Sequence, residues 1–574
     1  MRYAVLATDY DGTLATQGHV DAPTLAALEK VRQSGRKLIL VSGRHLPDLQ
    51  SVFSRLDLFD RAVLENGALL YTLETKQERL LCEPPPRNLQ EALRKRSVPF
   101  SAGRGILATW EPNQTAVLEA IHDLGLDLQV IFNKGAVMVL PSGINKASGL
   151  KAALNELSLS FHNVVGIGDA ENDHAFLAVC ECGVAVANAL PSLKDRADIV
   201  TAGDHGAGVV EIANQLLDDD LARYDARLSR HSISLGTRAD KSGEEVRISP
   251  SRNSILVAGP SASGKSTAVS GIVEQLAKQG YQFCLIDPEG DYEGFAGALS
   301  FGTAKEKPDI KAISQALADP DENLIINLLA VPVGERPNIF AGMLPVIMDQ
   351  RFRTARPHWL IIDEAHHLLP RSWSSVDGTL PRSLGGTILI TVHPDRISEA
   401  ALARVDVVIA TGESAIESLR VFARMRQMNE PPQPSPGAPQ SGESGQALIW
   451  FAGQSPPLLV VTPKADQERR RHLRQYAQGE LSPNQSFYFR GPESKLNLRA
   501  QNLETFLQMA DGVDDDTWLF HLRRGDYFTW FKNLIKDPDL AQEAAAVEQN
   551  RELSAADSRV LIRKAIEARY TAAS

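Results

Sequence analysis

Two short motifs that handle phosphate groups lie on this one chain, and each follows an apolar run. Residues Asp9 to Leu14 (DYDGTL) come after Ala4 to Ala7, and residues Gly259 to Thr267 (GPSASGKST) come after Ser254 to Ala258. Such runs are typical of buried parallel strands, at whose ends phosphate-binding loops sit. A Gly-x4-Gly-Lys-Ser/Thr match is expected by chance only roughly 0.02 times in a chain of this length. We therefore expect two separate active centres.

Length and composition predict a globular protein of several domains. With 574 residues, 43% of them hydrophobic, the chain is too long for one core and predicts about three or four domains. The net charge of -11 gives no general attraction for polyanions, so nucleic acid is allowed as a partner but not indicated. No leader opens the chain and no apolar run approaches the about 18 residues that span a bilayer. We expect a cytoplasmic protein with no membrane partner.

The cysteines do not indicate a metal site. They are scattered, and Cys180 and Cys182 lack a second pair or nearby histidines that would complete a ligand set. We interpret all four as reduced packing residues: Cys82, Cys180, Cys182 and Cys284.

The N-terminal motif is the first of four stretches that suit phosphate and a divalent cation. Because side chains alternate along a strand, Asp9 and Asp11 project the same way and can meet one phosphate. Ser42-Gly43 follows a second apolar strand and offers a hydroxyl and a flexible backbone, and Lys146 is a cation suited to phosphoryl transfer. The fourth stretch, Val164 to Asp173, is again a strand that ends in acids. Oxygen ligands of this kind suit Mg²⁺.

In this order, the four stretches resemble the haloacid dehalogenase superfamily of phosphatases, and Gly168 to Asp173 (GDAEND) is similar to its Cof-type branch. The resemblance covers about residues 1 to 215. It implies a Rossmann-like core at 1–83 and 143–220, with a small α/β cap at 84–142 that selects the substrate. It also implies that Asp9 attacks phosphorus to give an aspartyl-phosphate, while Asp11 acts first as acid and then as base. The expected substrate is a small phosphate monoester, such as a sugar phosphate or a phosphoglycolate-like acid.

The same resemblance implies which residues hold the substrate and the metal. The phosphoryl group would be bound and oriented by Ser42, Gly43, Lys146 and Asn172. The Mg²⁺ ion would be bound by Asp9, the backbone carbonyl of Asp11, Asp169 and Asp173. In the cap, Arg104 and Lys134 are cations that can meet an anionic substrate, but we interpret them as solvated surface residues.

The glycine-rich loop in the middle of the chain predicts a nucleotide site. Its backbone N–H groups and the following helix N-terminus form a cradle for phosphates. Lys265 would contact the β- and γ-phosphates, and Ser266 the Mg²⁺. Asp363 ends an apolar strand and can join the Mg²⁺ shell, while Glu364 can polarise water for attack on the γ-phosphate. The expected ATP contacts are Gly259, Ser261, Ala262, Ser263, Gly264, Lys265, Ser266 and Thr267.

With Leu285 to Tyr292 after the second strand, residues 231–462 look like the HerA/FtsK superfamily of P-loop ATPases. The resemblance implies a RecA-like, mainly parallel α/β domain that hydrolyses ATP. It implies a ring of identical copies, commonly a hexamer, in which Thr391 to His393 senses the γ-phosphate and a neighbouring subunit lends an arginine. The candidates for that arginine are Arg351, Arg353, Arg396 and Arg404. The block contains no basic loop with interleaved aromatics, which a nucleic-acid channel would prefer.

The last part of the chain, 463–574, predicts a small helical domain. Pro431 to Glu443 is rich in Pro, Ser and Gly and predicts a flexible loop before it. We interpret Arg469 to Arg474 as the solvated face of an amphipathic helix, with contact to nucleic-acid phosphates as the alternative. The aromatic residues of the predicted helices are interpreted as core: Trp518, Phe520, Trp530 and Phe531.

Together these features predict a bifunctional phosphohydrolase, in which an Mg²⁺-dependent phosphatase is joined to an ATP-hydrolysing module. Three alternatives remain open. The pair can process nucleic acid in repair or defence, with the ATPase as motor and the phosphatase trimming ends. It can heal ends as a polynucleotide kinase joined to a phosphatase, although the adjacent acids Asp363 and Glu364 favour hydrolysis over transfer. Last, it can be a scaffold with two inactive sites, which the full set of motif residues makes the weakest alternative.

Overall fold

The computed structural model describes residues 2–225, 228, 230–239, 243–260, 263–292, 294–372, 384–432, 445–454, 456–463, 481, 486–535 and 537–570. The chain divides into two compact units, Met1–Pro463 and Lys464–Ser574. Within the part described, no helix is both long and apolar enough to cross a membrane.

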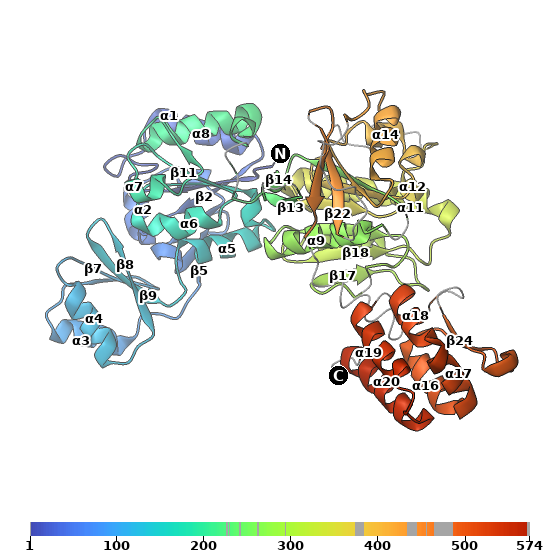
Figure 1. Ribbon diagram of the computed structural model, residues 1–574. Coiled ribbons are helices and arrows are strands. Elements are labelled where there is room, and N and C mark those ends of the chain that lie inside the picture. The colour runs from blue at the N-terminus through green and yellow to red at the C-terminus, as the bar shows by residue number, and fades with distance from the viewer. Residues whose placement is uncertain are drawn as a thin grey trace. The chain divides into compact units, whose positions relative to one another are not determined.

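An eight-stranded sheet forms the core of the N-terminal domain, in the order β12-β11-β10-β1-β2-β3-β4-β5 (Figure 1). The strands from β12 to β3 pair in parallel, and β4 and β5 add to the edge antiparallel. Every residue of β1 is buried, as expected of a central strand covered on both faces. The strands are β1 (Val5–Asp9), β2 (Lys37–Val41), β3 (Arg61–Leu64), β4 (Leu69–Thr72), β5 (Gln77–Leu80), β10 (Val164–Gly168), β11 (Cys182–Ala185) and β12 (Ile199–Val200).

Helices cover both faces of this sheet. One pair of helices, α1 and α8, packs together, and so does the pair α5 and α6; Figure 1 shows the two pairs on opposite faces. The helices are α1 (Ala22–Gln33), α2 (Leu46–Val52), α5 (Lys146–Glu156), α6 (His174–Val179), α7 (Pro191–Lys194) and α8 (His205–Asp219). The 3-10 turns are η1 (Leu56–Leu58), η2 (Glu65–Gly67), η3 (Phe161–Asn163), η4 (Glu171–Asp173) and η5 (Ala222–Tyr224).

A small α/β cap is inserted between β5 and α5. Its four strands form an antiparallel sheet in the order β6-β7-β9-β8. Its own core joins α3 and α4 to the sheet through Leu89, Leu93, Val117 and Val139. The elements are α3 (Arg87–Lys95), β6 (Ser101–Ala102), β7 (Leu107–Trp110), α4 (Gln114–Asp123), β8 (Leu128–Asn133) and β9 (Ala136–Pro141).

The central domain is built on an eleven-stranded sheet in the order β14-β13-β23-β22-β21-β15-β20-β19-β16-β18-β17. The strands from β21 to β17 are parallel, and the other four are antiparallel. Its strands are β13 (Ile233–Arg238), β14 (Glu245–Ile248), β15 (Ser254–Ala258), β16 (Phe283–Asp287), β17 (Ala298–Phe301), β18 (Asn323–Asn327), β19 (Trp359–Ile362), β20 (Thr387–Thr391), β21 (Val407–Thr411), β22 (Gln446–Phe451) and β23 (Leu458–Val461).

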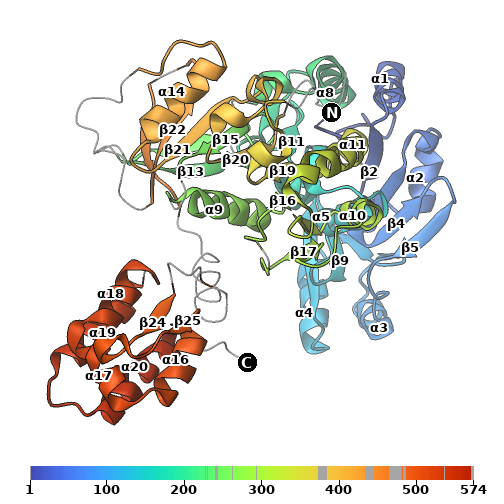
Figure 2. The ribbon, with the colours of Figure 1, turned by 90° about the vertical axis from the view of Figure 1, so that its right-hand side faces the viewer.

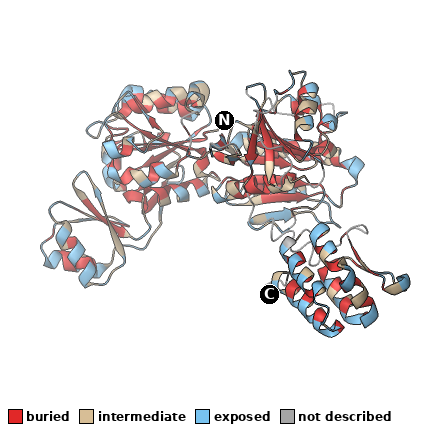
Figure 3. Cartoon of the chain, viewed as in Figure 1, coloured by how far each residue is buried: buried red, intermediate tan, exposed pale blue. Residues whose placement is uncertain are grey.

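Both faces of the second sheet are buried. Leu256 and Ala258 of β15 belong to one hydrophobic core, whereas Ile255 and Val257 belong to another. Since side chains alternate along a strand, the two cores lie on opposite faces, and Figure 3 shows the central strands buried. The helices are α9 (Lys265–Lys278), α10 (Ile310–Leu317), α11 (Arg336–Thr354), α12 (Ala365–Leu368), α13 (Glu399–Leu402) and α14 (Ala415–Met425), with 3-10 turns η6 (Val333–Glu335) and η7 (Pro394–Arg396).

Polar contacts join the N-terminal and central domains within their shared unit. The Arg356 guanidinium, which is fully buried, donates a hydrogen bond to the backbone carbonyl of Ser158. Ser160 Oγ lies 3.1 Å from His358 Nε2, and His162 Nε2 lies 2.8 Å from the carbonyl oxygen of Gln279.

The C-terminal unit, drawn as a ribbon in Figure 2, has its own aromatic core. Trp518, Trp530 and Phe531 are buried in it as predicted, whereas Phe520 is only half-buried, with the guanidinium of Arg524 over its ring. The unit is also not purely helical, because β24 pairs with β25. Its elements are β24 (Phe487–Phe489), η8 (Pro492–Ser494), β25 (Leu498–Ala500), α16 (Leu503–Gly512), α17 (Asp515–Arg524), α18 (Asp526–Asn533), α19 (Pro538–Gln549) and α20 (Ala555–Tyr570). Arg469 to Arg474 and most of Pro431 to Glu443 lie outside the described residues.

Candidate active sites

Three neighbouring strands bring polar residues to one edge of the first sheet. β1 ends at Asp9, β2 is followed by Ser42, and β10 is followed by Asp169. β2 and β10 flank β1 and run parallel to it. Their carboxyl ends therefore meet at the same edge, where ligands bind in open α/β sheets.

Lys146 is buried at this edge between two carboxylates. It begins α5, whose N-terminus is capped by Asn145, and its Nζ lies 2.5 Å from Asp9 Oδ1 and 2.6 Å from Asp173 Oδ1. Burial raises the pKa of Asp9, and the ammonium of Lys146 opposes that rise. In spite of its own burial, the two carboxylates keep the pKa of Lys146 above its ordinary value. A fixed ammonium beside Asp9 suits the negative charge of a phosphoryl group.

Asp173 and Asn172 shape the loop after β10. Asp173 Oδ2 accepts hydrogen bonds from the backbone N–H groups of Asp169 at 2.9 Å and Ala170 at 3.0 Å. Asn172 Nδ2 donates to Asn66 Oδ1 at 2.8 Å. Among the described residues, the buried Oδ1 of Asn172 has no hydrogen-bond partner. This leaves one amide oxygen of the predicted phosphate-orienting residue available.

The oxygens at this edge suit a divalent cation. Asp9, Asp169 and Asp173 bring carboxylate oxygens within 4.8 Å of one another. Lys134, at the turn between β8 and β9 of the cap, places its Nζ 2.7 Å from Asp169 Oδ2 and 3.0 Å from the carbonyl oxygen of Asp11. The Asp169 carboxylate and the Asp11 carbonyl therefore already contact one positive charge. Carboxylate and carbonyl oxygens are the ligand type that Mg²⁺ prefers. The residues fit the ion.

Arg44 holds the second aspartate of the motif. Its Nε lies 2.7 Å from Asp11 Oδ2 and its Nη2 lies 2.8 Å from Asp11 Oδ1, which is a bidentate ion pair. Nothing in the sequence alone indicates this role of Arg44, although it directly follows Ser42-Gly43. The interpretation of Lys134 as a solvated surface residue is wrong, because its ammonium contacts Asp11 and Asp169.

We expect Arg44→Ala to lower kcat for phosphate release by about tenfold or more, since a positioned acid–base group contributes about 10²–10⁴-fold. Arg44→Lys should restore little, because lysine cannot make two parallel hydrogen bonds to one carboxylate. Steady-state kinetics check this, with Arg55→Ala, an exposed arginine paired with Asp57, as the control. An unchanged kcat in Arg44→Ala would show that Asp11 needs no such support.

Comparison with known proteins agrees with this geometry. The sequence model of the haloacid dehalogenase-like hydrolases matches residues 6–95 and 115–212. Phosphoglycolate phosphatase 2 of Saccharolobus solfataricus is 31% identical over 227 residues, which cover 38% of this chain and 94% of that protein. The chain belongs to the haloacid dehalogenase-like hydrolases. The part of the chain that matches is the N-terminal domain with its cap, which we call the hydrolase domain.

Two further similarities concern the same part of the chain. Phosphoglycolate phosphatase of Methanothermobacter thermautotrophicus is 30% identical over 220 residues, covering 37% of this chain and 98% of that protein. A crystal structure of a haloacid dehalogenase-like hydrolase from Bacteroides thetaiotaomicron is 20% identical, with a TM-score of 0.33, and covers 37% of this chain and 99% of that one.

The glycine-rich loop of the central domain connects β15 to α9. Gly264 precedes α9 with a φ of 93°, and Lys265 begins the helix with its Nζ 3.0 Å from the carbonyl oxygen of Gly259 and 2.8 Å from that of Pro260. A Cβ on Gly259 would lie 2.5 Å from Thr411 Oγ1, so only glycine fits there. The loop thus folds around its lysine. Ser261 and Ala262, predicted to contact ATP, lie outside the described residues, whereas Ser263, Ser266 and Thr267 are described.

Two adjacent acids follow β19 on the same sheet. Asp363 is buried, and burial together with the neighbouring Asp287 and Glu364 raises its pKa well above the ordinary value. Glu364 has a left-handed φ of 41°, and burial raises its pKa to about 7. Its Oε2 is buried and lies 3.2 Å from His366 Nδ1. A strained, half-buried acid next to Asp363 is the kind of group that can bind a reacting water.

One strand, β20, lies between the strand of the glycine-rich loop and the strand of the acids. It ends at Thr391, whose Oγ1 accepts a hydrogen bond from the N–H of His393 at 2.9 Å and lies 3.1 Å from His366 Nδ1. Burial lowers the pKa of His366 to about 4, so its ring is neutral at pH 7. The predicted sensing residues Thr391 to His393 therefore lie at the edge shared by both motifs.

One of the four candidate arginines is unsuited to a role in a neighbouring subunit. Arg351 Nη2 donates to the backbone carbonyls of His358, Gly385 and Gly386 within its own domain. A guanidinium committed in this way cannot reach across an interface. Arg353, by contrast, is exposed, and within the described part of the chain it pairs with the exposed Asp349 of the same helix.

Proposed function

We propose that the hydrolase domain is a phosphatase that acts on a small phosphate monoester of the 2-phosphoglycolate type, and that the central domain hydrolyses ATP. The observation that carries the first half is the Lys146 ammonium between Asp9 and Asp173, at the sheet edge where Asp11, Ser42 and Asp169 also lie. The names of the two relatives, both phosphoglycolate phosphatases, support the substrate class.

In this proposal, the Asp9 carboxylate attacks phosphorus in line and forms an aspartyl-phosphate, while Asp11 gives a proton to the departing alcohol oxygen. Asp11 then takes a proton from water, which attacks the aspartyl-phosphate and releases inorganic phosphate and Asp9. Ser42, Lys146 and Asn172 hold the phosphoryl oxygens. Mg²⁺, held by Asp9, the carbonyl of Asp11, Asp169 and Asp173, would supply positive charge at the phosphoryl group.

The cap lysine gives a test of the substrate class. Lys134 reaches the catalytic edge from the cap, so it can pair with the carboxylate of 2-phosphoglycolate. We expect Lys134→Ala to raise KM for 2-phosphoglycolate by about tenfold or more, because a hydrogen bond to a charged group contributes about 1.5–3 kcal/mol, with a smaller change in kcat. Lys95→Ala, which removes an exposed lysine of the same cap, is the control. An unchanged KM for 2-phosphoglycolate in Lys134→Ala would show that Lys134 takes no part in binding this substrate.

For the central domain, Lys265 would bind the β- and γ-phosphates of ATP, and Ser266 and Asp363 the associated Mg²⁺. Glu364 would take the proton of the attacking water. The Glu364 carboxylate, placed next to Asp363 with its Oε2 buried, is the observation that supports hydrolysis over transfer to another substrate. A homo-oligomeric ring remains a prediction from the sequence.

The deciding experiment measures inorganic phosphate release from a panel of monoesters, each with and without ATP. The panel holds 2-phosphoglycolate, sugar phosphates, nucleotides, and oligonucleotides phosphorylated at the 3′ or 5′ end. Turnover of 2-phosphoglycolate well above the other compounds supports the proposal. Selective turnover of the oligonucleotides would instead favour end processing, and absence of turnover with Mg²⁺ present would refute the phosphatase.

A further inference from the structure

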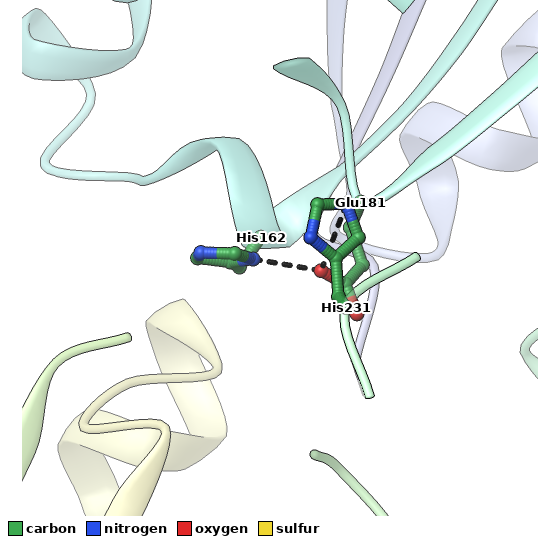
Figure 4. Close-up of side chains that lie close together, drawn as sticks. All are labelled: His162, Glu181 and His231. Carbon is green, nitrogen blue, oxygen red and sulfur yellow. Dashed lines mark hydrogen bonds and ion pairs between the residues drawn. The ribbon is translucent and has the colours of Figure 1, made fainter. Parts of the chain in front are cut away.

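A cluster of two imidazoles and one carboxylate lies outside both candidate centres, beside the contact between the hydrolase and central domains. His162 is in η3, Glu181 precedes β11, and His231 lies in the connection to β13 (Figure 4). One ligand atom from each lies within 4.8 Å of the other two. His162 Nδ1 is 2.7 Å from Glu181 Oε2, and His231 Nε2 is 4.0 Å from the same oxygen.

Hydrogen bonds determine which nitrogen of His162 can bind a ligand. Its Nε2 lies 2.8 Å from the carbonyl oxygen of Gln279, which can only accept, so Nε2 carries a proton. Its Nδ1 faces the carboxylate of Glu181, which accepts as well. Nδ1 must therefore carry a second proton or bind a cation in its place. A histidine that donates its other N–H to a backbone carbonyl is the usual arrangement at a metal.

The carboxylate of Glu181 is held so that one oxygen faces the imidazoles. Arg2 pairs with Oε1, while Oε2 faces His162 and also accepts a hydrogen bond from Tyr281 at 2.9 Å. Although burial opposes ionisation, the hydrogen bond from His162 and the charge of Arg2 lower the pKa of Glu181 below its usual range. Arg2 is itself paired with Asp225 at 2.9 Å, so its charge is balanced. A carboxylate whose orientation is fixed by an ion pair at one oxygen, and whose other oxygen can bind an ion, is a suitable metal ligand.

His231 is positioned by the residue before it. Arg230 lies 2.5 Å from Asp198 and donates to the carbonyl oxygen of Cys180 at 3.0 Å, which holds this part of the connection against the hydrolase domain. Burial lowers the pKa of His231. Its Nε2 lies 3.4 Å from the same carbonyl of Cys180, which is a long contact.

A third nearby histidine is not available as a ligand. His358 Nδ1 accepts a hydrogen bond from the N–H of Gln282 at 2.9 Å, so its proton is on Nε2, which donates to Ser160 Oγ at 3.1 Å. Both of its nitrogens are committed. The described residues therefore offer three ligand atoms here, and water can complete a fourfold set.

We propose that His162 Nδ1, Glu181 Oε2 and His231 Nε2 bind one Zn²⁺, which fastens the connection between the two domains. Two imidazoles and a carboxylate suit this ion, with water as the fourth ligand. Ligand atoms around tetrahedral zinc lie about 3.4 Å apart, so the 2.7 Å pair opens and the 4.0 Å pair closes by less than about 1 Å. Zn²⁺ replaces the Nδ1 proton of His162, which is released to solvent. His231 gives up its contact with the carbonyl of Cys180. Its Nε2 proton passes to solvent while Nδ1 takes one up, so that Nε2 binds the ion.

The test uses the full chain, freed of metal with a chelator and returned to buffer with excess Mg²⁺, which saturates the oxygen-only sites. Zn²⁺ uptake is measured by equilibrium dialysis and elemental analysis, and Co²⁺ is added separately to read ligand geometry from its visible absorption. We expect one Zn²⁺ per chain, a tetrahedral Co²⁺ spectrum, and a higher Tm with Zn²⁺. His231→Ala should weaken Zn²⁺ binding by at least about tenfold, as loss of metal-site support does, and remove the Tm rise.

His122→Ala is the matched control, because it removes an exposed imidazole elsewhere in the hydrolase domain. It should bind Zn²⁺ as the unchanged protein does. Glu181→Gln is a second variant, expected to weaken binding while keeping the size of the side chain. Equal Zn²⁺ uptake in the unchanged protein and His231→Ala, or an all-oxygen Co²⁺ spectrum, would overturn the proposal and leave His162 as a protonated bridge to Glu181. None of these readouts depends on either enzymatic activity.

Discussion

Replacing Asp9 with asparagine should abolish phosphate release from the monoester, with a fall in kcat of about 10⁴-fold or more, the scale at which loss of a nucleophile is felt. The amide cannot form the acyl phosphate, and the ammonium of Lys146 keeps only Asp173 as an anionic partner at that point. ATP hydrolysis by the same variant should be unchanged, because the glycine-rich loop lies on a different sheet. Phosphate release from 2-phosphoglycolate and from ATP, measured separately, checks both halves.

Asp195→Asn, a change at an exposed carboxylate of the same domain, is the matched control. Circular dichroism and Tm establish that Asp9→Asn is folded, which is needed because Asp9 is buried beside Lys146. Normal turnover by a folded Asp9→Asn protein would place the nucleophile elsewhere. Loss of both activities in a folded protein would mean that the two centres are energetically coupled.

Replacing Glu364 with glutamine should lower ATP hydrolysis by about 10²–10⁴-fold, because the amide cannot accept a proton from water. ATP should still bind, since Lys265 and the loop are unchanged. Lys265→Ala, by contrast, should weaken ATP binding in addition to lowering ATP hydrolysis. Titration with a fluorescent ATP analogue measures binding, and phosphate release measures turnover.

Glu335→Gln, at an exposed glutamate paired with Lys307, is the control for Glu364→Gln. Phosphatase activity should be unaffected in both variants. ATP hydrolysis that survives Glu364→Gln would assign the water-activating role to another residue, and loss of ATP binding would make Glu364 a structural residue of the loop.

The catalytic edge of the hydrolase domain could be predicted because its parts are marked locally. Asp9 follows an apolar run, Asp11 is two residues on, and Asp169 ends another run. The rule that parallel strands end at one edge then brings them together. Its positioning residues could not be predicted in this way. The Arg44 pair with Asp11 depends on how the chain turns after β2, and Lys134 reaches the site only because the cap folds back over the core.

The central domain shows the same division. The apolar runs predicted individual strands, but no local pattern indicates that β20 lies between β15 and β19, and the edge strand β17 has too few buried residues to be recognised. In the C-terminal unit, Phe487 and Phe489 point inward on either side of the half-exposed Tyr488. That alternation marks a strand, but three residues are too few to distinguish it from a helix by periodicity.

The polar contacts between the hydrolase and central domains affect how well each domain can be produced separately. Arg356 is fully buried, and its guanidinium donates hydrogen bonds to carbonyl and amide oxygens. One of these oxygens is the backbone carbonyl of Ser158, which belongs to the hydrolase domain. Cutting the chain between the domains would remove the hydrogen bond from that guanidinium to the carbonyl of Ser158. A gene fragment that encodes either domain alone would therefore expose a surface that the full chain covers. Poor solubility of such a fragment would reflect this exposed surface and not a defect in the catalytic site.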